Sequence, residues 1–334
     1  MFKDKKILIT GGTGSLGTAL TKKLLTTEVD TIRIFSRDEW KQVQMKSKFN
    51  DSRLRFFIGD IRDKERLSRA TEDVNIVIHA AALKHVPVAE YNPFEAVKTN
   101  VNGAQNIIES CLDNNVELVL AISTDKAVSP INTYGATKLL MERLFVSANN
   151  YRGDHKIKFL CVRYGNVLGS RGSVVPLFIK QITDEENLTI TDTSMTRFNI
   201  TMDESIKLIF RAIENGQGGE IFIPKLKAYR LGDLKDALME ILKSDSKIKA
   251  LPIRPGEKLH ETLINIDEIK NTFESEHDYI IIDKLIQNSD TFNLKNLSVA
   301  KLNDGYSSDK SDILSKEEIK QILLNENLIP NQNN

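Results

Sequence analysis

A tyrosine and a lysine four residues apart, Tyr134 and Lys138, are the residues of this sequence best suited to acid–base chemistry. They begin a helical pattern, so both side chains project from one face of a helix. A tyrosine alone is a poor base because its pKa is roughly 10, but a neighbouring ammonium favours the phenolate and lowers that pKa. Tyr134 could therefore take a proton from a hydroxyl group, and Thr124 could hydrogen-bond the same oxygen.

The loop Gly11–Gly17 has the residue types of a phosphate-binding turn. Gly11, Gly14 and Gly17 keep a G-x-x-G-x-x-G spacing after a strand-like run and before a helical pattern. Such glycines permit a tight turn, backbone approach to a pyrophosphate and close helix–strand packing. A glycine-rich turn without a ligand is the alternative, but the strand–loop–helix context favours a bound dinucleotide. The residues expected to contact it are Gly11, Thr13, Gly14, Ser15, Leu16 and Gly17.

The end of the second expected strand indicates which dinucleotide is preferred. It reads Ser36-Arg37-Asp38-Glu39. A carboxylate here typically binds the ribose 2′-hydroxyl of NAD, whereas a cation binds the 2′-phosphate of NADP. Arg37 and Ser36 favour NADP, although Asp38 and Glu39 keep NAD possible. Asp60-Ile61, after the third strand, is expected to meet the adenine ring, with an ordinary turn aspartate as the alternative reading of Asp60.

The elements that position these residues form an alternating pattern in the first half of the chain. Apolar, β-branched runs typical of strands cover 6–10, 31–35, 54–58, 74–79, 116–122 and 158–163. Helical patterns cover 16–25, 64–70, 93–114 and 135–148. This alternation predicts an α/β fold, a Rossmann-type doubly wound parallel sheet with helices on both faces.

After about residue 170 the rhythm changes to shorter, mixed elements interrupted by prolines. Helices are expected near 203–214, 231–242 and 315–324, and the segment from about Ser289 to the last of these is polar and irregular. We therefore expect a dinucleotide-binding domain over 1–170. The rest, 171–334, should be mainly a smaller α/β substrate-binding lobe and a tail, with some chain crossing between lobes. A cleft between the two is the natural ligand site.

The composition argues against several other classes of protein. Lys+Arg and Asp+Glu both number 46, so no net charge favours nucleic acid or an anionic membrane. Cys111 and Cys161 are too few for a disulfide framework, and the five histidines lack metal-ligand spacing, so no metal site is expected. No stretch approaches about 18 consecutive apolar residues and no signal peptide is evident, which favours a cytoplasmic protein without a membrane segment.

Together these residues resemble the extended short-chain dehydrogenase/reductase superfamily. Longer motifs resemble, more specifically, the inverting UDP-N-acetylglucosamine 4,6-dehydratases, which open the pseudaminic acid pathway of flagellin glycosylation. The resemblance covers roughly residues 1–280. Its motifs are Ala80-Ala81-Ala82-Leu83-Lys84-His85-Val86-Pro87, Ser123-Thr124-Asp125-Lys126-Ala127, Asn132-Thr133-Tyr134-Gly135-Ala136-Thr137-Lys138, Arg163-Tyr164-Gly165-Asn166-Val167, Gly169-Ser170-Arg171-Gly172-Ser173-Val174, Met195-Thr196-Arg197-Phe198 and Arg254-Pro255-Gly256-Glu257-Lys258.

The resemblance implies oxidation of the sugar at C4 by a tightly bound, recycled NADP, loss of the C6 hydroxyl as water, and inversion at C5. The family's acid–base pair corresponds here to Asp125, as acid toward the C6 hydroxyl, and Lys126, as base at C5. Adjacent residues of a regular strand face opposite ways, so both can reach one sugar only if the strand has already ended. Lys126 as a base also requires a lowered pKa. A pair that merely supports the loop is the alternative.

The resemblance also implies a nucleotide-sugar site, for UDP-N-acetylglucosamine, and a homo-oligomer. Its expected residues are Lys84, Asn166, Arg171, Arg197, Arg254 and Glu257, with surface ion pairs as the rival reading for each arginine. Ala80, Ala81 and Lys84 should lie near the nicotinamide, and His85 is as readily a structural histidine. Asn199 stands where the family more often has an aromatic residue, which could loosen the sugar pocket. Beyond about residue 285 only Tyr306-Ser307-Ser308-Asp309 matches well.

Three other functions stay open on the sequence alone. A C5-retaining 4,6-dehydratase differs only in which faces of the sugar meet the acid and the base. A UDP-sugar 4-epimerase needs only the tyrosine, the lysine and the cofactor, so the Asp125-Lys126 pair argues against it. A non-catalytic NADP-sensing protein on the same fold is a different class, but such proteins often lack the active tyrosine that this sequence retains.

Overall fold

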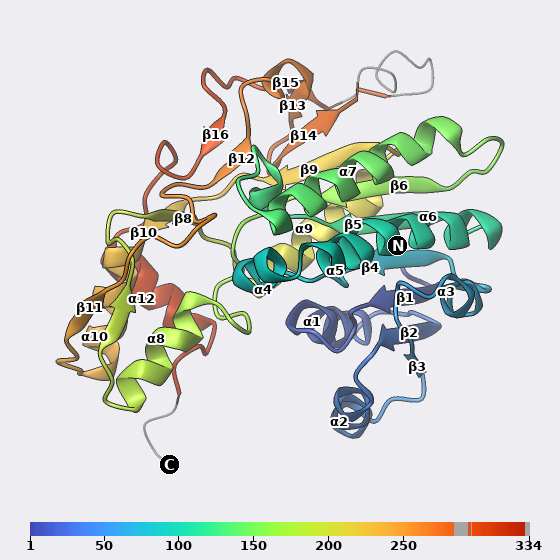
Figure 1. The fold of residues 1–334 in the computed structure, drawn as a ribbon. Helices are drawn as coiled ribbons and strands as arrows, with labels where there is room; N and C mark the ends of the chain where they lie inside the picture. Colours follow the sequence, from blue (N-terminus) through green and yellow to red (C-terminus); the bar gives the residue numbers. More distant parts are fainter. Residues whose placement is uncertain (284–292, 295, 331–334) are drawn as a thin grey trace.

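The computed structural model describes residues 1–283, 293–294 and 296–330. Within them, ten strands form one sheet in the order β15-β13-β14-β9-β6-β5-β4-β1-β2-β3. The strands from β3 to β9 pair in parallel, whereas β14, β13 and β15 extend the sheet antiparallel. The chain winds outward in both directions from the β1–β4 pair, which confirms the predicted doubly wound α/β fold (Figure 1).

The strands lie at β1 (Lys6–Thr10), β2 (Thr31–Ser36), β3 (Leu54–Ile58), β4 (Ile76–His79), β5 (Leu118–Ile122), β6 (Lys158–Val162), β7 (Leu188–Ile190), β8 (Thr196–Phe198), β9 (Glu220–Pro224), β10 (Ala228–Arg230), β11 (Ile248–Ala250), β12 (Thr262–Ile264), β13 (Thr272–Glu274), β14 (Asp278–Ile282), β15 (Ser298–Val299) and β16 (Tyr306–Ser307). The six strands expected in the first half are all present. Their ends differ from the predicted ones by two residues at most.

The helices lie at α1 (Ser15–Leu24), α2 (Glu39–Phe49), α3 (Lys64–Thr71), α4 (Val86–Tyr91), α5 (Pro93–Val97), a π-helical turn η1 (Lys98–Asn102), α6 (Gly103–Asp113), a 3-10 turn η2 (Asp125–Ala127), α7 (Thr133–Tyr151), α8 (Val174–Thr183), α9 (Met202–Asn215), α10 (Leu231–Leu242), a 3-10 turn η3 (Ile269–Asn271) and α12 (Lys316–Asn325). None of those among the described residues is long and apolar enough to cross a membrane.

The pleat of the strands explains the two layers of helices. Alternate residues of a strand face opposite sides of the sheet. Ile7 and Ile9 of β1 pack with α1, α2 and α9 on one face, and Leu8 packs with α3, α6 and α7 on the other. Both clusters are fully removed from solvent at β1, which is why this strand reads as a continuous apolar run.

One predicted helix is interrupted in the structure, and helix α2 was missed. The pattern over 93–114 is not one helix, because the π-helical turn Lys98–Asn102 interrupts it between α5 and α6. Helix α2 was not predicted at all, because only Gln42 and Met45 of its residues are buried and its apolar pattern is correspondingly weak. The Asp38 side chain caps its N-terminus by accepting a hydrogen bond from the Lys41 N–H.

The second half of the chain divides its elements between the main sheet and a smaller lobe. Strands β9, β13 and β14 belong to the main sheet, and helix α9 packs against one face of it. Helices α8, α10 and α12 pack around a separate apolar cluster, beside the two-stranded pairs β7–β11 and β8–β10 (Figure 1, left). In the last part of the chain, strand β16 pairs antiparallel with β12. Residues 289–292 of the predicted irregular segment lie outside the described residues.

A buried ionic cluster joins α7 to the segment that follows β12. Arg163, at the end of β6 and only 1% exposed, donates to both oxygens of Glu142 on α7 (3.0 and 2.7 Å). It also donates to both oxygens of Glu268 (3.0 and 2.9 Å). Because charges are costly to bury unless they are paired, each member depends on the others. This cluster fixes the middle of the helix that carries Tyr134 and Lys138.

Replacing the guanidinium of this cluster should destabilise the whole protein. In Arg163→Met, Glu142 and Glu268 would be left as buried carboxylates without their cation. We expect a loss of about 3–5 kcal/mol in the free energy of unfolding, measured by urea denaturation. Arg143→Met, at the adjacent exposed position of α7, is the control and should change stability by less than about 0.5 kcal/mol. Equal stability of the two variants would contradict the role given to the cluster.

Candidate functional site

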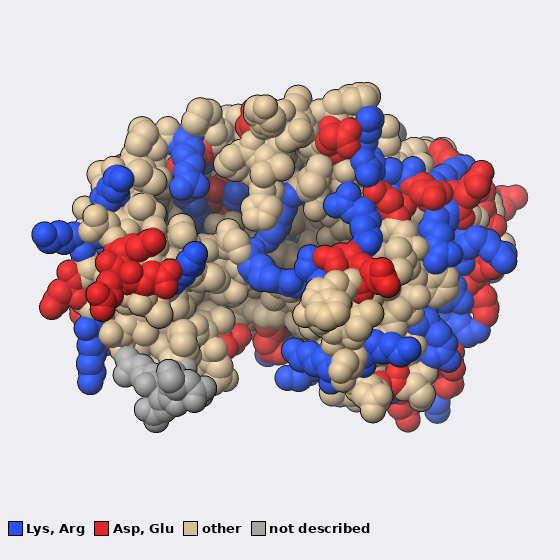
Figure 2. Space-filling model, turned by 60° about the horizontal axis from the view of Figure 1, so that its bottom comes forward, with Lys and Arg blue, Asp and Glu red and all other residues tan. Residues whose placement is uncertain are grey.

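A cleft of about 880 Å³ opens at the carboxyl ends of the parallel strands. It lies beside the paired strands β1 and β4, from which the strand order runs outward in both directions. This is the position at which doubly wound sheets bind ligands. Figure 2 shows a central hollow with Lys and Arg side chains along its walls. The cations that line the cleft are Arg37, Lys41, Lys84, Lys126, Lys138, Arg171, Arg197, Arg254 and Lys258.

The glycine loop forms one end of this cleft. Gly11 has φ +66°, and a Cβ there would lie 2.9 Å from the backbone of Ala81, so only glycine lets the loop and the strand β4 extension approach so closely. The Gly14 N–H donates to the Gly11 carbonyl (2.8 Å). Helix α1 begins at Ser15 without a side-chain cap, which leaves its first N–H groups available to an anion. These features fit a dinucleotide pyrophosphate.

The expected ribose end of the dinucleotide lies beyond β2. Arg37 is exposed and 3.6 Å from Asp60, which also accepts two hydrogen bonds from the Arg62 side chain. Burial acts to raise the pKa of Asp60, but these hydrogen bonds and charges outweigh it and lower that pKa. The Ser36 hydroxyl accepts from Gln42 (3.0 Å). Asp38, the candidate NAD-type carboxylate, instead caps α2.

Tyr134 and Lys138 both lie on the first turns of α7 and both line the cleft. Gly135 allows this placement, because a Cβ there would overlap the Lys126 carbonyl oxygen. The Lys138 ammonium donates to the Ile122 carbonyl (2.6 Å), and burial lowers its pKa to about 8. Burial raises the pKa of Tyr134 to about 12, although the Lys126 charge and the Thr124 hydroxyl act to lower it. The phenol is therefore protonated until further positive charge is placed beside it.

Asp125 and Lys126 lie past the end of β5, in the 3-10 turn η2, so the alternation of a strand no longer separates their side chains. The Lys126 ammonium is 3.1 Å from Asp125 Oδ1 and 3.2 Å from Glu261 Oε1, and it donates to Asn166 Oδ1 (3.3 Å). Burial acts to lower the pKa of Lys126, but the charges of Asp125 and Glu261 outweigh it and raise that pKa above its ordinary value. The pair is brought together, but Lys126 is held as an ammonium.

The Asp125 carboxylate is fully buried, and the cleft is lined by its neighbours instead. Its Oδ1 accepts from the Thr124 hydroxyl (2.7 Å) and from Lys126. Its Oδ2 has no hydrogen-bond partner among the described residues. An unpaired buried carboxylate oxygen is costly. The Oδ2 atom of Asp125 is therefore open to a further hydrogen-bond donor.

The remaining expected ligands divide between the two ends of the cleft. The Arg171 guanidinium contacts the glycine loop from a distant part of the chain. Its Nη2 donates to the Thr13 carbonyl (2.8 Å) and its Nε to Ser15 Oγ (3.3 Å). The Lys84 ammonium donates to the Arg171 carbonyl (3.1 Å), and burial lowers the pKa of Lys84. Arg171 therefore lies where it can reach a cofactor phosphate as well as a nucleotide sugar.

At the opposite end, Arg197 crosses from β8 to the loop before β12. Its guanidinium donates to the carbonyls of Leu259 (3.0 Å) and Lys258 (3.1 Å) and lies 4.0 Å from Glu257. The Arg254 N–H donates to Glu257 Oε2 (3.3 Å). Arg197, Arg254 and Glu257 thus form one connected wall of the cleft.

Residues 7–283 match a family described as "Polysaccharide biosynthesis protein". The chain belongs to this family. A UDP-N-acetylglucosamine 4,6-dehydratase (inverting) of Campylobacter jejuni is 49% identical, over 97% of this chain and 98% of the relative. A UDP-glucose 4-epimerase of Rickettsia felis is 41% identical, over 97% of each chain. The similarity to inverting dehydratases that the motifs indicated is thereby confirmed.

Solved structures show the same fold. Pen from Bacillus thuringiensis has a TM-score of 0.93 and 41% identity, covering 98% of this chain and 100% of its own. DesIV, a dTDP-glucose 4,6-dehydratase from Streptomyces venezuelae solved with NAD, has a TM-score of 0.70 and 23% identity, covering 76% of this chain and 86% of its own. The second likeness, at this identity, shows the fold alone.

The sequence reasoning missed Glu261 and Lys258. Both line the cleft, and Lys258 donates to the Val128 carbonyl (2.7 Å). No local signal marks Glu261, which lies four residues beyond the run Arg254–Glu257, directly before β12. Asn199, by contrast, does not line the cleft, and its N–H donates to the Lys227 carbonyl (2.9 Å). Its expected effect on the sugar pocket has no direct contact behind it.

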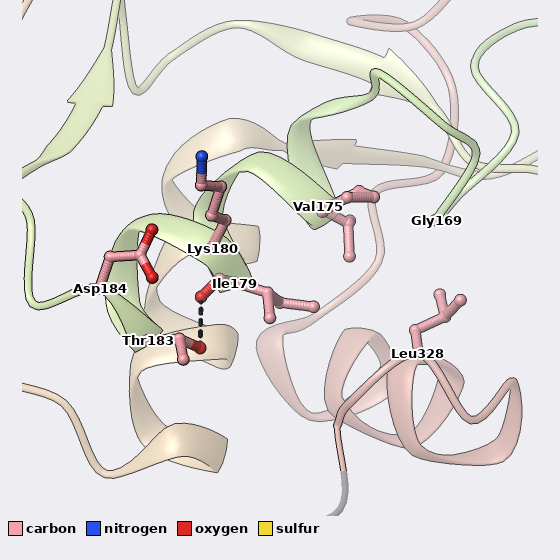
Figure 3. A pocket seen from close by; sticks show the side chains of 8 residues that line it. Gly169, Val175, Ile179, Lys180, Thr183, Asp184 and Leu328 are labelled. Carbon is pink, nitrogen blue, oxygen red and sulfur yellow. Dashed lines mark hydrogen bonds between the residues drawn. The ribbon is translucent and has the colours of Figure 1, made fainter.

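A second pocket lies away from these residues, between α8 and the chain end near Leu328 (Figure 3). Its volume is about 310 Å³, and its side chains include Val175, Ile179 and Lys180. Thr183 caps the end of the helix by donating to the Ile179 carbonyl (2.9 Å). Lys180 and Asp184 both line this pocket, but the glycine loop, Tyr134 and Lys126 line the larger cleft.

Proposed function

We propose that this protein is an NADP-dependent lyase, a UDP-N-acetylglucosamine 4,6-dehydratase that inverts C5. The product would be UDP-2-acetamido-2,6-dideoxy-β-L-arabino-hex-4-ulose, the first intermediate of pseudaminic acid biosynthesis. One observation carries the proposal: Tyr134 and Lys126 line one cleft behind a glycine loop suited to a dinucleotide, and Asp125 is buried 3.1 Å behind the Lys126 ammonium. The relative from Campylobacter jejuni, similar over the full chain, supports the same substrate and stereochemistry. Association into a homo-oligomer is part of this proposal.

The cofactor's chemistry is to accept hydride from C4 and to return it at C6. The glycine loop would hold its pyrophosphate, and Arg37 with Ser36 its 2′-phosphate. Lys41 also lines this end of the cleft, and Asp38 is engaged with the Lys41 N–H and ammonium (3.0 and 2.6 Å). The carboxylate that would select NAD is thus already paired, which supports NADP.

Tyr134 would take the proton of the C4 hydroxyl. The Thr124 hydroxyl lies beside the tyrosine phenol, where it acts to lower the pKa of Tyr134, and would contact the same oxygen of the sugar. Lys138, with its pKa of about 8, is mainly charged at neutral pH and favours the phenolate. The oxidation produces a ketone at C4, which acidifies the proton at C5.

Lys126 would remove that C5 proton, and Asp125 would protonate the departing C6 hydroxyl. For these roles Lys126 must be a neutral amine and Asp125 a neutral acid. Transfer of one proton from Nζ to the carboxylate across the 3.1 Å contact produces both states at once, without a net change of charge. Asp125 Oδ2 has no hydrogen-bond partner among the described residues, so this oxygen is open to a further donor. Reprotonation of C5 from the opposite face then inverts the centre.

The Rickettsia relative named as a 4-epimerase makes epimerisation the specific rival. An epimerase returns hydride to C4 and needs no acid–base pair for C5 and C6. The cluster around Lys126 has no task in that reaction, whereas elimination of water requires it. A C5-retaining dehydratase and a non-catalytic NADP-sensing protein are the remaining alternatives.

Incubation with UDP-N-acetylglucosamine in D₂O, followed by proton NMR, tests the function. We expect a 4-keto-6-deoxy product of L-arabino configuration with deuterium at C5, formed without added cofactor because the cofactor is recycled. Lys126→Ala should lose C5 exchange. A D-xylo product would assign a retaining dehydratase, and a 4-epimer would assign the rival reaction. Unchanged sugar from protein with bound NADP would contradict the proposal.

Removal of the Arg37 guanidinium should change cofactor preference. In Arg37→Ala we expect NADP affinity to fall roughly tenfold to a hundredfold, the worth of one charge-assisted hydrogen-bonding group. NAD affinity should change little, since NAD lacks the 2′-phosphate. Calorimetric titration with both nucleotides measures this. Arg55→Ala, an exposed arginine on β3 outside the cleft, is the control. Equal losses of both nucleotides in Arg37→Ala would contradict the assignment of Arg37 to the 2′-phosphate.

A further inference from the structure

Glu261 is a buried carboxylate that lines the cleft and contacts its principal cations. It is 2% exposed. Its Oε1 lies 3.2 Å from the Lys126 ammonium and 3.6 Å from Arg197 Nε. Its Oε2 has no hydrogen-bond partner among the described residues. A side chain buried at this cost, with a charge directed to one lysine, calls for a functional reason.

The tail of the chain holds Glu261 in place. The Glu261 N–H donates to Ser308 Oγ (2.9 Å), and its carbonyl accepts from the Ser308 N–H (2.8 Å). Ser308 is fully buried, and its hydroxyl also contacts Thr196 Oγ1 (2.7 Å). Tyr306, two residues earlier, exchanges hydrogen bonds through its hydroxyl with the backbone of Leu226 (2.6 and 2.8 Å). Two hydrogen bonds from Ser308 therefore fix the backbone of Glu261, and the contacts of Ser308 with Thr196 and of Tyr306 with Leu226 anchor that segment.

We propose that Glu261 is a positioning residue of the catalytic centre, which holds the Lys126 ammonium opposite Asp125 and is itself fixed by Ser308 of the tail. The inference rests on the proposed function for its catalytic meaning, but not for its geometry. With a carboxylate on each side, Nζ has a fixed position over the cleft. It can pass its proton to Asp125 and keep its orientation through Glu261.

The charges around Lys126 determine what the loss of Glu261 would do. The groups that act on Lys126, or on which Lys126 acts, are Asp125, Glu261, Arg197, Lys84, Lys258, Tyr134 and Tyr229. Asp125 and Glu261 raise the pKa of Lys126, whereas burial and Arg197 lower it. Removing one of the two carboxylate charges leaves burial and the cations less opposed. The pKa of Lys126 should then fall.

Glu261→Gln tests this, because it keeps the shape and removes the charge. The pH dependence of Lys126 reductive methylation by formaldehyde with cyanoborohydride as the hydride donor, read by mass spectrometry of its peptide, reports the amine directly and needs no substrate. We expect the midpoint to move to lower pH by about one to three units, the effect of one adjacent charge. The Lys126-dependent limb of the C5 exchange rate in D₂O should move in the same direction.

Two further variants separate this role from a structural one. Glu268→Gln removes a carboxylate of the Arg163 cluster, which does not contact Lys126, and should leave the Lys126 midpoint in place. Ser308→Ala keeps the Glu261 charge but removes the acceptor of the Glu261 N–H, one of the two hydrogen bonds that hold its backbone, and should shift the midpoint to lower pH by less than Glu261→Gln. It also serves if Glu261→Gln does not fold.

An unchanged Lys126 midpoint in Glu261→Gln, or in Ser308→Ala if the first does not fold, would overturn the inference. An equal shift in Glu268→Gln would overturn it too, by showing a general loosening. A shifted Lys126 midpoint in Glu261→Gln, together with a wild-type protein that leaves UDP-N-acetylglucosamine unchanged, would support the positioning role and reject the substrate. The two proposals therefore fail separately.

Discussion

The Lys126 ammonium lies between two carboxylates in a largely buried position, and the arrangement of the site follows from the cost of keeping those charges there. A charge removed from water must be paired, and each partner must be held in place by backbone. Asp125 is held by the turn after β5, and its N–H donates to the Tyr164 carbonyl (3.1 Å). Glu261 is held by the tail. Lys126 thus links the first half of the chain to the segment that carries Ser308.

The sheet supplies the common edge at which these segments meet. Strands β1, β4, β5 and β6 end at one side, and the loops that follow carry the glycine turn, Lys84, the Asp125 turn and Asn166. Helix α7 brings Tyr134 back over the same edge. The buried pairing of Arg163 with Glu142 and Glu268 sets the position of that helix relative to the segment between β12 and β13, which carries Glu268. The acid–base groups are therefore oriented by contacts that lie outside the cleft.

The features that the sequence predicted well depend on local patterns. The glycine loop, the Tyr134–Lys138 spacing and the strand runs each lie within a few residues of chain, where periodicity and turn chemistry decide the structure. Glu261 could not be found in this way, because its partner Lys126 lies 135 residues earlier and the pairing exists only in the fold. For the same reason the charged state of Lys126 was not predicted, since neighbours distant in sequence raise its pKa.

Other expectations were limited by competing forces. The break between α5 and α6 leaves no mark in the apolar periodicity, and α2 buries too little to show one. The boundary near residue 170 stays a prediction, while α9 and β9 return to the main sheet after it. The contact of the Arg171 guanidinium with the glycine loop was not expected, and the role of Arg171 at a nucleotide sugar stays a prediction. A sequence places such a residue on a loop but does not say which ligand that loop will face.

The central claim is that one cleft takes hydride from C4 and delivers it to C6 while the groups around Lys126 expel water. Incubation with UDP-N-acetylglucosamine carrying deuterium at C4 tests it most directly. NMR and mass spectrometry of the product should find the deuterium in the C6 methyl group, retained within the same molecule. Deuterium found again at C4, on a 4-epimer, would contradict the account and assign the cleft to epimerisation.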